Sequence, residues 1–200
     1  MKIICVGRNY AAHAAELGDE LPAAPLLFGK FTNTLIGPGE AIVLPPEATH
    51  VDAEAELCIE IGTAGHRIPE ARALEHVRGY RCANDLSARN IQYTESQWTR
   101  AKGFDTFGPL GPWMETAVDP ADLGITTSVN GAVKQHARTS ELLWDVPSLV
   151  EYVSSVMTLL PGDVLLTGTP EGVGPMTDGD EVSVTVESVG TLTNRVVIRD

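Results

Sequence analysis

The chain has 200 residues, of which 14 are basic and 27 acidic, and its formal net charge is -13 at pH 7. Such a charge repels phosphate backbones and anionic lipid surfaces, so we expect neither nucleic acid nor a membrane as a partner. Hydrophobic residues make up 43% and charged residues 20% of the chain, which is typical of a globular protein and excludes a disordered one. We predict a single domain over residues 1–200.

The three cysteines, Cys5, Cys58 and Cys82, lie in apolar surroundings, and their spacing matches neither a disulfide framework nor a thiolate metal site. We therefore expect free, buried thiols in a reducing compartment. The apolar run that follows Lys2 is too short for the hydrophobic region of a signal peptide. Together these features predict a cytoplasmic protein.

Short strands and short helices are predicted along the first half of the chain. We expect strands over residues 3–7, 23–31, 41–46, 51–62 and 78–85. Helices are expected over residues 9–18, 69–77 and 86–99. Gly18 is suited to end the first helix, Pro69 to begin the second, and Ser87 to cap the third.

The second half of the chain is dominated by predicted strands. Asn130-Gly131 lies between alternating residues, which indicates a β-hairpin within residues 126–137. Residues 146–159 have the period of an amphipathic helix. Further strands are expected over residues 163–170, 180–190 and 191–199. Because strands outnumber helices and do not alternate with long helices, we predict an α+β, mainly β fold with a few short helices.

The segment VDAEAELCIEIG, residues 51–62, places three carboxylates at every second position. In a strand, Asp52, Glu54 and Glu56 would share one face, and like charges on one face repel unless solvent or a cation screens them. Glu54 and Glu56 would suit a hard divalent cation such as Mg²⁺ or Mn²⁺, and Asp85 in CANDLSARN is the best candidate for a third ligand. The alternatives are a solvated strand face and an ordinary turn aspartate.

A second group of candidate residues lies in GRNYAAHAAELG, residues 7–18. His13 and Glu16 are three residues apart, so on a helix they share a face and can pair. A carboxylate beside an imidazole orients it and stabilises its protonated form, which suits a base that takes a proton from water. The alternative is an ordinary surface histidine and glutamate on a short helix.

Two further segments are suited to contact an anionic substrate. Lys102 stands near Trp98 and Phe107, an apolar setting in which its ammonium would pair with an anion; the alternative is a lysine at the edge of a loop. The loop LLTGTPEGVG, residues 165–174, offers Thr169 and backbone amides for a carboxylate. It lacks the Lys-Ser/Thr ending of a phosphate-binding loop, so a nucleotide site is not indicated.

Taken together, these segments resemble the fumarylacetoacetate hydrolase family. The blocks that carry the resemblance follow the family's order and spacing over nearly the whole chain: GRNYAAHAAELG, PLLFGKF, HVDAEAELCIEIG, GYRCANDLSARNIQ, WTRAKGFDTFGPLGPW, VNGAVKQ and LLTGTPEGVG. The resemblance implies a mixed β-sheet roll or sandwich and a homodimer. Because the chain begins almost at GRNY, it is similar to the short, single-domain members of the acylpyruvase, oxaloacetate decarboxylase and 2-hydroxyhepta-2,4-diene-1,7-dioate isomerase type.

The resemblance also implies roles for individual residues. The ligands of Mg²⁺ or Mn²⁺ would be Glu54, Glu56 and Asp85. The catalytic residues would be His13 and Glu16, on a short lid helix, and Lys102, which would face the substrate. The substrate-binding residues would be Arg8, Lys30, Arg89, Gln92 and Thr169. The chain departs from the family pattern at Asn90, where aspartate is expected, and at Ala53, where a larger residue is common.

The expected substrate is a 2-oxo acid that chelates the metal through its carboxylate and ketone oxygens, so that the cation stabilises an enolate. An acyl leaving group needs a water molecule, which His13 and Glu16 would activate, whereas loss of CO₂ from oxaloacetate needs none. The pair favours C–C bond hydrolysis of an acylpyruvate such as fumarylpyruvate, with oxaloacetate decarboxylation as a further activity. The alternatives are an isomerase or decarboxylase of a 2-oxo/2-hydroxy-dienedioate in aromatic catabolism, and a non-catalytic metal-binding protein.

Overall fold

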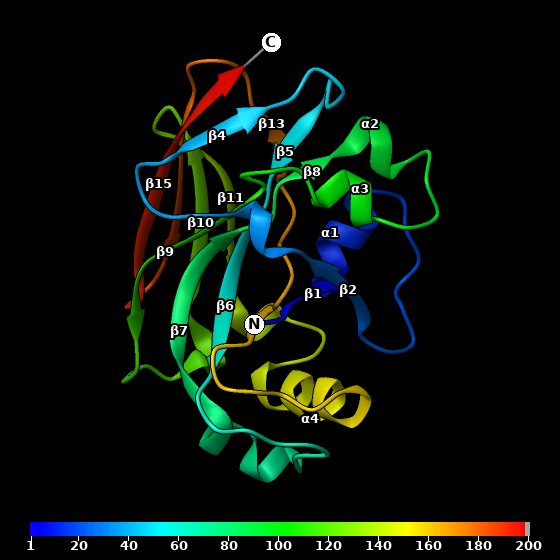
Figure 1. Ribbon diagram of the computed structural model, residues 1–200, viewed down its shortest axis with the longest axis vertical. Coiled ribbons are helices and arrows are strands. Elements are labelled where there is room, and N and C mark those ends of the chain that lie inside the picture. Colours follow the sequence, from blue (N-terminus) through cyan, green and yellow to red (C-terminus); the bar gives the residue numbers. More distant parts are fainter. Residues whose placement is uncertain (199–200) are drawn as a thin grey trace.

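Strands arranged in three sheets form the framework of the computed structural model, which describes residues 1–198 (Figure 1). The large sheet has seven strands, in the spatial order β2 (Leu26–Lys30), β1 (Ile3–Gly7), β12 (Val164–Leu166), β6 (Ala55–Ile61), β7 (Val77–Asn84), β9 (Gly108–Glu115) and β3 (Leu35–Ile36). A second sheet has five strands, in the order β11 (Ala132–Arg138), β10 (Gly124–Val129), β14 (Glu181–Val186), β15 (Gly190–Ile198) and β4 (Ala41–Leu44). The third sheet consists of β13 (Gly174–Pro175), β5 (Val51–Ala53) and β8 (Ser87–Ala88). The α+β, mainly β fold expected from the sequence is confirmed.

The helices are short. The α-helices are α1 (Ala11–Glu16), α2 (Arg89–Gln92), α3 (Thr99–Lys102) and α4 (Val146–Val156). The 3₁₀ helices are η1 (Thr32–Thr34), η2 (Glu70–His76), η3 (Pro120–Asp122) and η4 (Thr139–Glu141). In Figure 1, α1, α2 and α3 lie together on the side away from the five-stranded sheet, and α4 lies at the lower end, where it contacts η2. Within residues 1–198, no helix combines the length and apolar character needed to cross a bilayer.

Strand β6 is buried on both of its faces. One face packs in the main core, which also contains side chains of the five-stranded sheet; this face consists of Ala55, Leu57, Ile59 and Ile61. On the other face, Cys58 packs with Ile3 and Cys5 of β1. Full burial of each large aliphatic side chain contributes roughly 1.5–3 kcal/mol to folding, so β6 is a rigid base for the residues that precede it. All three cysteines are free and buried, as expected.

Two strands leave the large sheet at the same point. β6 and β7 pair as far as Ala55 and Asn84, and beyond this point β5 pairs with β8 in the small sheet. At the change, the Asp85 amide donates a hydrogen bond to the Glu54 carbonyl (2.9 Å), and the Glu54 amide donates to the side-chain oxygen of Asn84 (2.9 Å). These bonds satisfy the backbone where the ladder is interrupted, and they bring Glu54 and Asp85 side by side.

The predicted helix over residues 86–99 is wrong. Its first residues form β8, and only α2 and the beginning of α3 within this range are helical. Ser87 does not cap a helix, because its hydroxyl accepts a hydrogen bond from Lys102 Nζ (2.7 Å). Trp98 packs against Phe28 with their ring centroids 5.2 Å apart. Long-range sheet pairing and aromatic packing therefore outweigh the local helix propensity.

Other predicted elements agree more closely with the structure. The hairpin is confirmed: β10 and β11 are joined by Asn130 (φ 52°) and Gly131 (φ 79°), which have the positive φ of a type I′ turn. The helix predicted over residues 69–77 is the 3₁₀ helix η2, and the acidic strand over residues 51–62 is divided at Glu54. Of the strand predicted over residues 191–199, residues 191–198 lie within β15, and residue 199 lies outside the described residues.

Candidate active site

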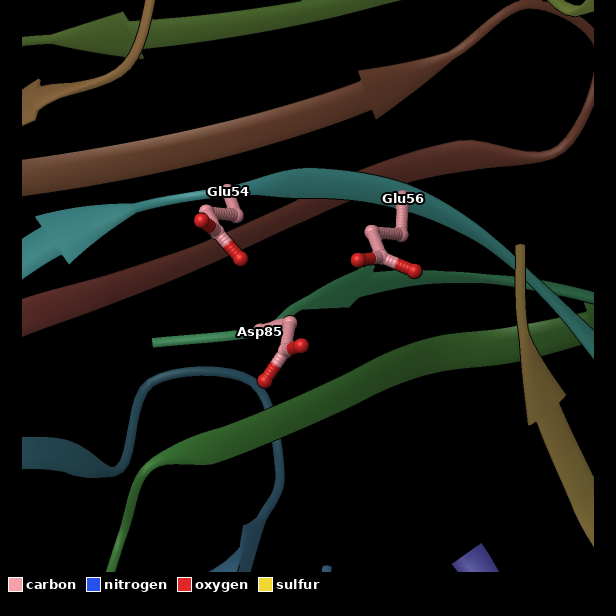
Figure 2. A group of neighbouring side chains, drawn as sticks. All are labelled: Glu54, Glu56 and Asp85. Atoms are coloured by element: carbon pink, nitrogen blue, oxygen red, sulfur yellow. The ribbon is translucent and has the colours of Figure 1, made fainter. Parts of the chain in front are cut away.

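The carboxylates of Glu54, Glu56 and Asp85 face one another where the two strands leave the large sheet (Figure 2). One oxygen from each residue lies within 4.8 Å of the others. The three residues are 3%, 2% and 0% exposed, respectively. Glu54 and Glu56 share a face because they are two residues apart in an extended segment, and Asp85 directly follows β7. Their burial excludes the alternative of a solvated strand face.

Two lysines contact this carboxylate cluster. Lys102 Nζ donates hydrogen bonds to Glu54 Oε2 (2.8 Å), Asp85 Oδ2 (2.7 Å) and Ser87 Oγ (2.7 Å). Lys30 Nζ donates to Asp85 Oδ1. An ammonium has three donors, so Lys102 is fully engaged with the protein's own groups. The aromatic setting of Lys102 in the sequence did not indicate these acidic partners.

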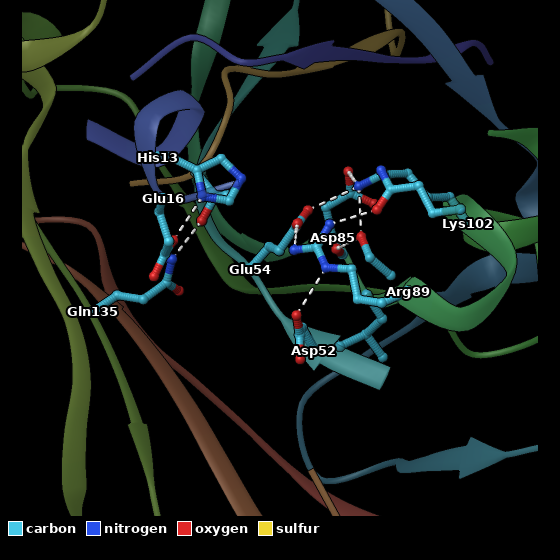
Figure 3. Close-up of polar contacts among 12 residues, drawn as sticks. His13, Glu16, Asp52, Glu54, Asp85, Arg89, Lys102 and Gln135 are labelled. Carbon is cyan, nitrogen blue, oxygen red and sulfur yellow. Dashed lines mark hydrogen bonds and ion pairs between the residues drawn. The ribbon is translucent and has the colours of Figure 1, made fainter. Parts of the chain in front are cut away.

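Arg89 joins the cluster from α2 (Figure 3). Its Nη2 donates to Glu54 Oε1, its Nε to Asp52 Oδ2 (2.8 Å), and its Nη1 to Gln92 Oε1 (2.6 Å). The other oxygen of Asp52 lies 3.0 Å from His50 Nε2. Asp52 is thus the carboxylate of the acidic row that orients Arg89. Asp52 belongs to the acidic row recognised in the sequence, but its pairing with Arg89 was not predicted.

Glu56 differs from the other two carboxylates. It accepts a hydrogen bond from the Gly168 amide (2.7 Å), and no ion pair within residues 1–198 involves it. Burial and the neighbouring charges of Asp85 and Glu54 raise the pKa of Glu56 well above its ordinary value. A cation placed among the three oxygens would oppose this shift, because it favours the ionised form.

The ion pairs determine the charge state of the other groups. Burial by itself raises the pKa of Glu54, but the charges of Lys102 and Arg89 outweigh burial and hold that pKa well below its ordinary value. Burial lowers the pKa of Lys102, but Asp85 and Glu54 outweigh it, so this pKa is raised. Glu54 and Lys102 are therefore both charged at neutral pH.

His13 and Glu16 form the pair predicted from their spacing, at the end of α1 (Figure 3). His13 Nδ1 lies 3.1 Å from Glu16 Oε2, and Glu16 Oε1 accepts a hydrogen bond from the Gly172 amide (3.0 Å). An ionised carboxylate only accepts hydrogen bonds, so Nδ1 carries the hydrogen and Nε2 is left as the basic nitrogen. His13 is 5% exposed, which excludes the alternative of an ordinary surface histidine.

A cavity of ≈ 100 Å³ lies between α1 and the carboxylate cluster. Most of the predicted site residues line it: Arg8, His13, Glu54, Glu56, Asp85, Arg89, Gln92, Lys102 and Thr169. Glu16 and Lys30 are not among the lining residues, and they contact the cavity walls through His13 and Asp85. Phe28 and Trp98 provide apolar walls. The structure therefore brings together residues from both ends of the chain around one space.

Gln135 is a buried site residue that was not predicted. Its Nε2 donates to Thr169 Oγ1 and to the Pro170 carbonyl (both 2.7 Å), and its Oε1 accepts from the Ala55 amide (2.9 Å) and from Thr127 Oγ1 (2.6 Å). It is 0% exposed. Because Ala55 lies between two of the carboxylates, Gln135 ties their backbone to the 165–174 loop. In the sequence it is one polar residue in an alternating strand, with no local signal of this role.

The chemistry of the cluster fits a hard divalent cation. Its three ligand atoms are all carboxylate oxygens, the kind of donor that Mg²⁺ and Mn²⁺ prefer. Their hydrogen-bond partners, such as Lys102 and Gly168, hold the carboxylates in place from outside the cluster. The 165–174 loop contributes two of its amides to the protein's own carboxylates, Glu56 and Glu16, whereas the sequence suggested a ligand carboxylate.

Comparison with known proteins agrees with this arrangement. Residues 2–197 match the family model described as fumarylacetoacetate (FAA) hydrolase C-terminal. A crystal structure of 5-carboxymethyl-2-hydroxymuconate delta-isomerase from Mycobacterium smegmatis is similar, with 56% identity, a TM-score of 0.94, and coverage of 100% of this chain and 79% of that one.

Two further relatives are known by other activities. A fumarylpyruvate hydrolase from Pseudomonas aeruginosa, solved in complex with Mn²⁺ and pyruvate, has 33% identity and a TM-score of 0.93, with coverage of 100% of this chain and 90% of that one. Oxaloacetate tautomerase Fahd2a, mitochondrial, from Rattus norvegicus is 41% identical over 207 residues, which covers 98% of this chain and 66% of the relative. Hydrolase, isomerase and tautomerase names thus occur among proteins similar to this chain.

Proposed function

The chain belongs to the fumarylacetoacetate hydrolase family, and we propose that it is a Mg²⁺- or Mn²⁺-dependent enzyme that acts on 2-oxo acids. In this proposal, the main reaction is C–C bond hydrolysis of an acylpyruvate such as fumarylpyruvate. The observation that carries it is a single cavity lined both by the acidic cluster and by His13, whose Nδ1 is held by Glu16. The Mn²⁺ and pyruvate in the related hydrolase support the choice of cation and substrate class.

Glu54, Glu56 and Asp85 would hold the cation. When bound, a divalent cation supplies a Lewis acid that favours negative charge on the oxygens of a 2-oxo acid. Lys102 and Arg89 keep Glu54 ionised, and Lys102 and Lys30 pair directly with Asp85. Because these contacts exist before any ligand arrives, the carboxylates need little reorganisation during the reaction.

His13 would transfer the proton in the hydrolytic reaction. Water adds to the acyl carbon of R–CO–CH₂–CO–COO⁻, the bond from that carbon to CH₂ breaks, and the products are R–COO⁻, pyruvate and one proton. His13 Nε2 takes the proton from the attacking water, and the Glu16 carboxylate stabilises the resulting imidazolium. The imidazolium can then protonate the CH₂ carbon, which completes pyruvate, and the new carboxylic acid releases its proton.

A second candidate function is isomerisation or decarboxylation of a 2-oxo or 2-hydroxy dienedioate. The high similarity to the M. smegmatis isomerase favours it, and so does the similarity to the rat tautomerase. Tautomerisation and isomerisation require a proton to be moved between carbon or oxygen atoms without water addition. The cavity that contains His13 would serve these reactions as well.

The test is turnover of acetylpyruvate, fumarylpyruvate and oxaloacetate by the EDTA-treated protein, followed by ultraviolet absorbance with and without added Mn²⁺. We expect Mn²⁺-dependent loss of fumarylpyruvate and no turnover by the Glu54→Ala/Glu56→Ala variant. If oxaloacetate were decarboxylated faster than the acylpyruvates are hydrolysed, decarboxylation and not hydrolysis would be the main reaction. No turnover of these three substrates, together with a Mn²⁺-induced rise in melting temperature, would favour the dienedioate isomerase or the non-catalytic metal-binding alternative.

We propose a homodimer that acts on small molecules in the cytoplasm, without nucleic acid or membrane as a partner. Light scattering of the purified protein would measure the assembly, and cell fractionation would measure the location. A monomer in solution, or a mitochondrial location like that in the name of the rat relative, would contradict the respective part.

A further inference from the structure

A line of contacts runs from the surface of the protein to the Glu54 carboxylate. His50 Nε2 lies 3.0 Å from Asp52 Oδ1, and Asp52 Oδ2 accepts a hydrogen bond from Arg89 Nε (2.8 Å). Arg89 Nη2 in turn donates to Glu54 Oε1, and Figure 3 shows this inner part of the line. The side chain of His50 is 51% exposed, whereas those of Asp52 and Arg89 are 6% and 2% exposed. The line therefore joins a histidine in contact with solvent to one of the buried carboxylates.

Arg89 transmits position along this line because its guanidinium is planar and rigid. Asp52 accepts from Nε and Gln92 accepts from Nη1 (2.6 Å), so the plane of the group is fixed by two contacts. Nη2 then donates to Glu54 in a direction that the other two contacts set. A rotation of the Asp52 carboxylate would therefore change the contact at Glu54.

The Asp52 carboxylate depends on His50 for its orientation. The backbone of Asp52 is fixed in the small sheet, where it pairs with Ser87 of β8 and Pro175 of β13. The side chain can still rotate, and its two oxygens contact different groups, His50 and Arg89. A carboxylate that is paired with a guanidinium accepts hydrogen bonds, so His50 Nε2 is the donor whether the ring is neutral or protonated. With a partner on each oxygen, the carboxylate is held in one orientation.

His50 is itself held against α2. Asn90 Oδ1 accepts a hydrogen bond from the His50 amide (3.3 Å), and Asn90 Nδ2 donates to the Glu47 carbonyl (2.9 Å). The Arg89 amide donates to the His50 carbonyl (2.8 Å). At position 90 the chain departs from the family pattern, and the aspartate expected there could accept from the His50 amide but could not donate to Glu47. Asparagine at this position therefore fixes residues 47–50 to α2 at two points.

We propose that His50 is a positioning residue for the acidic cluster: through Asp52 and Arg89, it orients one of the carboxylates and so raises the affinity of the cluster for a divalent cation. The inference rests on the proposed function, in which that carboxylate, Glu54, is a ligand. Groups that orient ligands from outside a metal site contribute to affinity without contacting the ion. Because two residues stand between His50 and Glu54, the contribution of His50 is smaller than that of Asp52.

The test measures Mn²⁺ affinity by calorimetry, so turnover is not required. We expect a loss of about 3- to 10-fold in His50→Leu, as for one ordinary hydrogen bond, and of about 10- to 100-fold in Asp52→Asn. His50→Gln, whose amide can also donate to Asp52, should restore the affinity to within about 2-fold of the wild type. In the Asp52→Asn background, His50→Leu should change the affinity by less than about 2-fold, because the two residues act along one line.

His66→Leu is the matched control, because His66 is also exposed and lies outside the cavity, and its Mn²⁺ affinity should equal that of the wild type. Urea unfolding reports whether each variant remains folded. Wild-type affinity in His50→Leu, or equal losses in His50→Leu and His50→Gln, would overturn the positioning role of His50. An equal effect of His50→Leu in both backgrounds would overturn the route through Asp52. Failure of the wild-type protein itself to bind Mn²⁺ would instead overturn the proposed function, and this outcome is distinguishable because it involves no variant.

Discussion

The two sides of the cavity are built in different ways. On one side, Glu54, Glu56 and Asp85 are at most 3% exposed, and their partners come from β2, α2, α3 and the 165–174 loop. On the other side, the side chain of Glu16 is 33% exposed and pairs with His13 within the same six-residue helix. So short a helix is unstable by itself, and α1 is attached to the loop through the Gly172 amide.

This difference separates two tasks. The charges that would hold a cation are fixed by long-range contacts, and the proposed proton-transfer pair, His13 and Glu16, is carried by a small element that depends on few contacts. Elements with few buried contacts open with the least free energy, so α1 is the part of the site that we expect to exchange its amide hydrogens first. Substitutions on the two sides should therefore have different consequences.

The largest effect is expected from Asp85→Asn on the carboxylate side. The substitution leaves Lys30 and Lys102 with uncompensated buried charge, which costs roughly 3–5 kcal/mol of unfolding free energy. It also removes one of the proposed ligands, so Mn²⁺ affinity should fall by more than about 100-fold, beyond the loss expected for an outer contact. Urea unfolding and calorimetry measure the two quantities.

The matched control for Asp85→Asn is Asp122→Asn. Asp122 pairs with Arg138 at an exposed position, where ion pairs contribute little to stability. Unchanged Mn²⁺ affinity in Asp85→Asn would contradict its role as a ligand, whatever the change in stability.

His13→Ala tests the other side. We expect hydrolysis to fall by about 10²- to 10⁴-fold, because the proposed general base is lost, while Mn²⁺ affinity changes by less than about 3-fold. Oxaloacetate decarboxylation, which needs no activated water, should be largely retained. His136→Ala removes an exposed histidine of β11 and serves as the control. If hydrolysis and decarboxylation were lost equally, the assignment of His13 to water activation would be wrong.

Gln135→Ala is expected to have an intermediate effect, because Gln135 connects the two sides through Ala55 and Thr169. Mn²⁺ affinity should fall by about 10- to 100-fold, as for loss of a group that positions a ligand. Buried partners left unpaired should also lower stability by roughly 1–3 kcal/mol. Lys134→Ala, at the exposed neighbouring position, should change neither quantity. A loss of stability with unchanged Mn²⁺ affinity would show that Gln135 has only a structural role.

The smallest effect is expected from Asp163→Asn, which alters a buried carboxylate that belongs to neither side of the cavity. Burial raises the pKa of Asp163, but the hydrogen bonds from Lys2 and the Leu160 amide outweigh it and lower the pKa below its ordinary value. A carboxyl group whose pKa is lowered in the folded state stabilises the protein at pH values above its ordinary pKa. This stabilisation is lost as the pH falls through the pKa of the folded state. Asp163→Asn should therefore flatten the decline in stability below about pH 4.

The effect of Asp163→Asn at pH 7 should remain below about 2 kcal/mol, since one-third exposure of Lys2 allows solvent to screen the pair. Unfolding by urea at pH 3 and pH 7 measures it. An unchanged slope with pH would show that other carboxylates dominate the acid response.

Local features of the site were predictable because they depend on neighbours in the sequence. Helical spacing placed His13 beside Glu16, and the period of an extended chain placed Glu54 and Glu56 on one face. The hairpin at Asn130-Gly131 follows in the same way from the φ values that a two-residue turn requires. The mainly β fold was predictable from the number of alternating segments.

The remaining features were decided by contacts between distant segments. From the sequence alone, Asp85 could be either a turn aspartate or a metal ligand. Its place beside Glu54 depends on β6 and β7 leaving the large sheet at the same point. Ser87 is a strand residue because it pairs with Asp52. Lys102, Arg89 and Gln135 meet partners 37 to 80 residues away for some of their strongest contacts. Spacing in the sequence therefore determined which neighbouring side chains share a face. Tertiary structure decided their partners, because the energy of a buried charge depends on the groups that surround it.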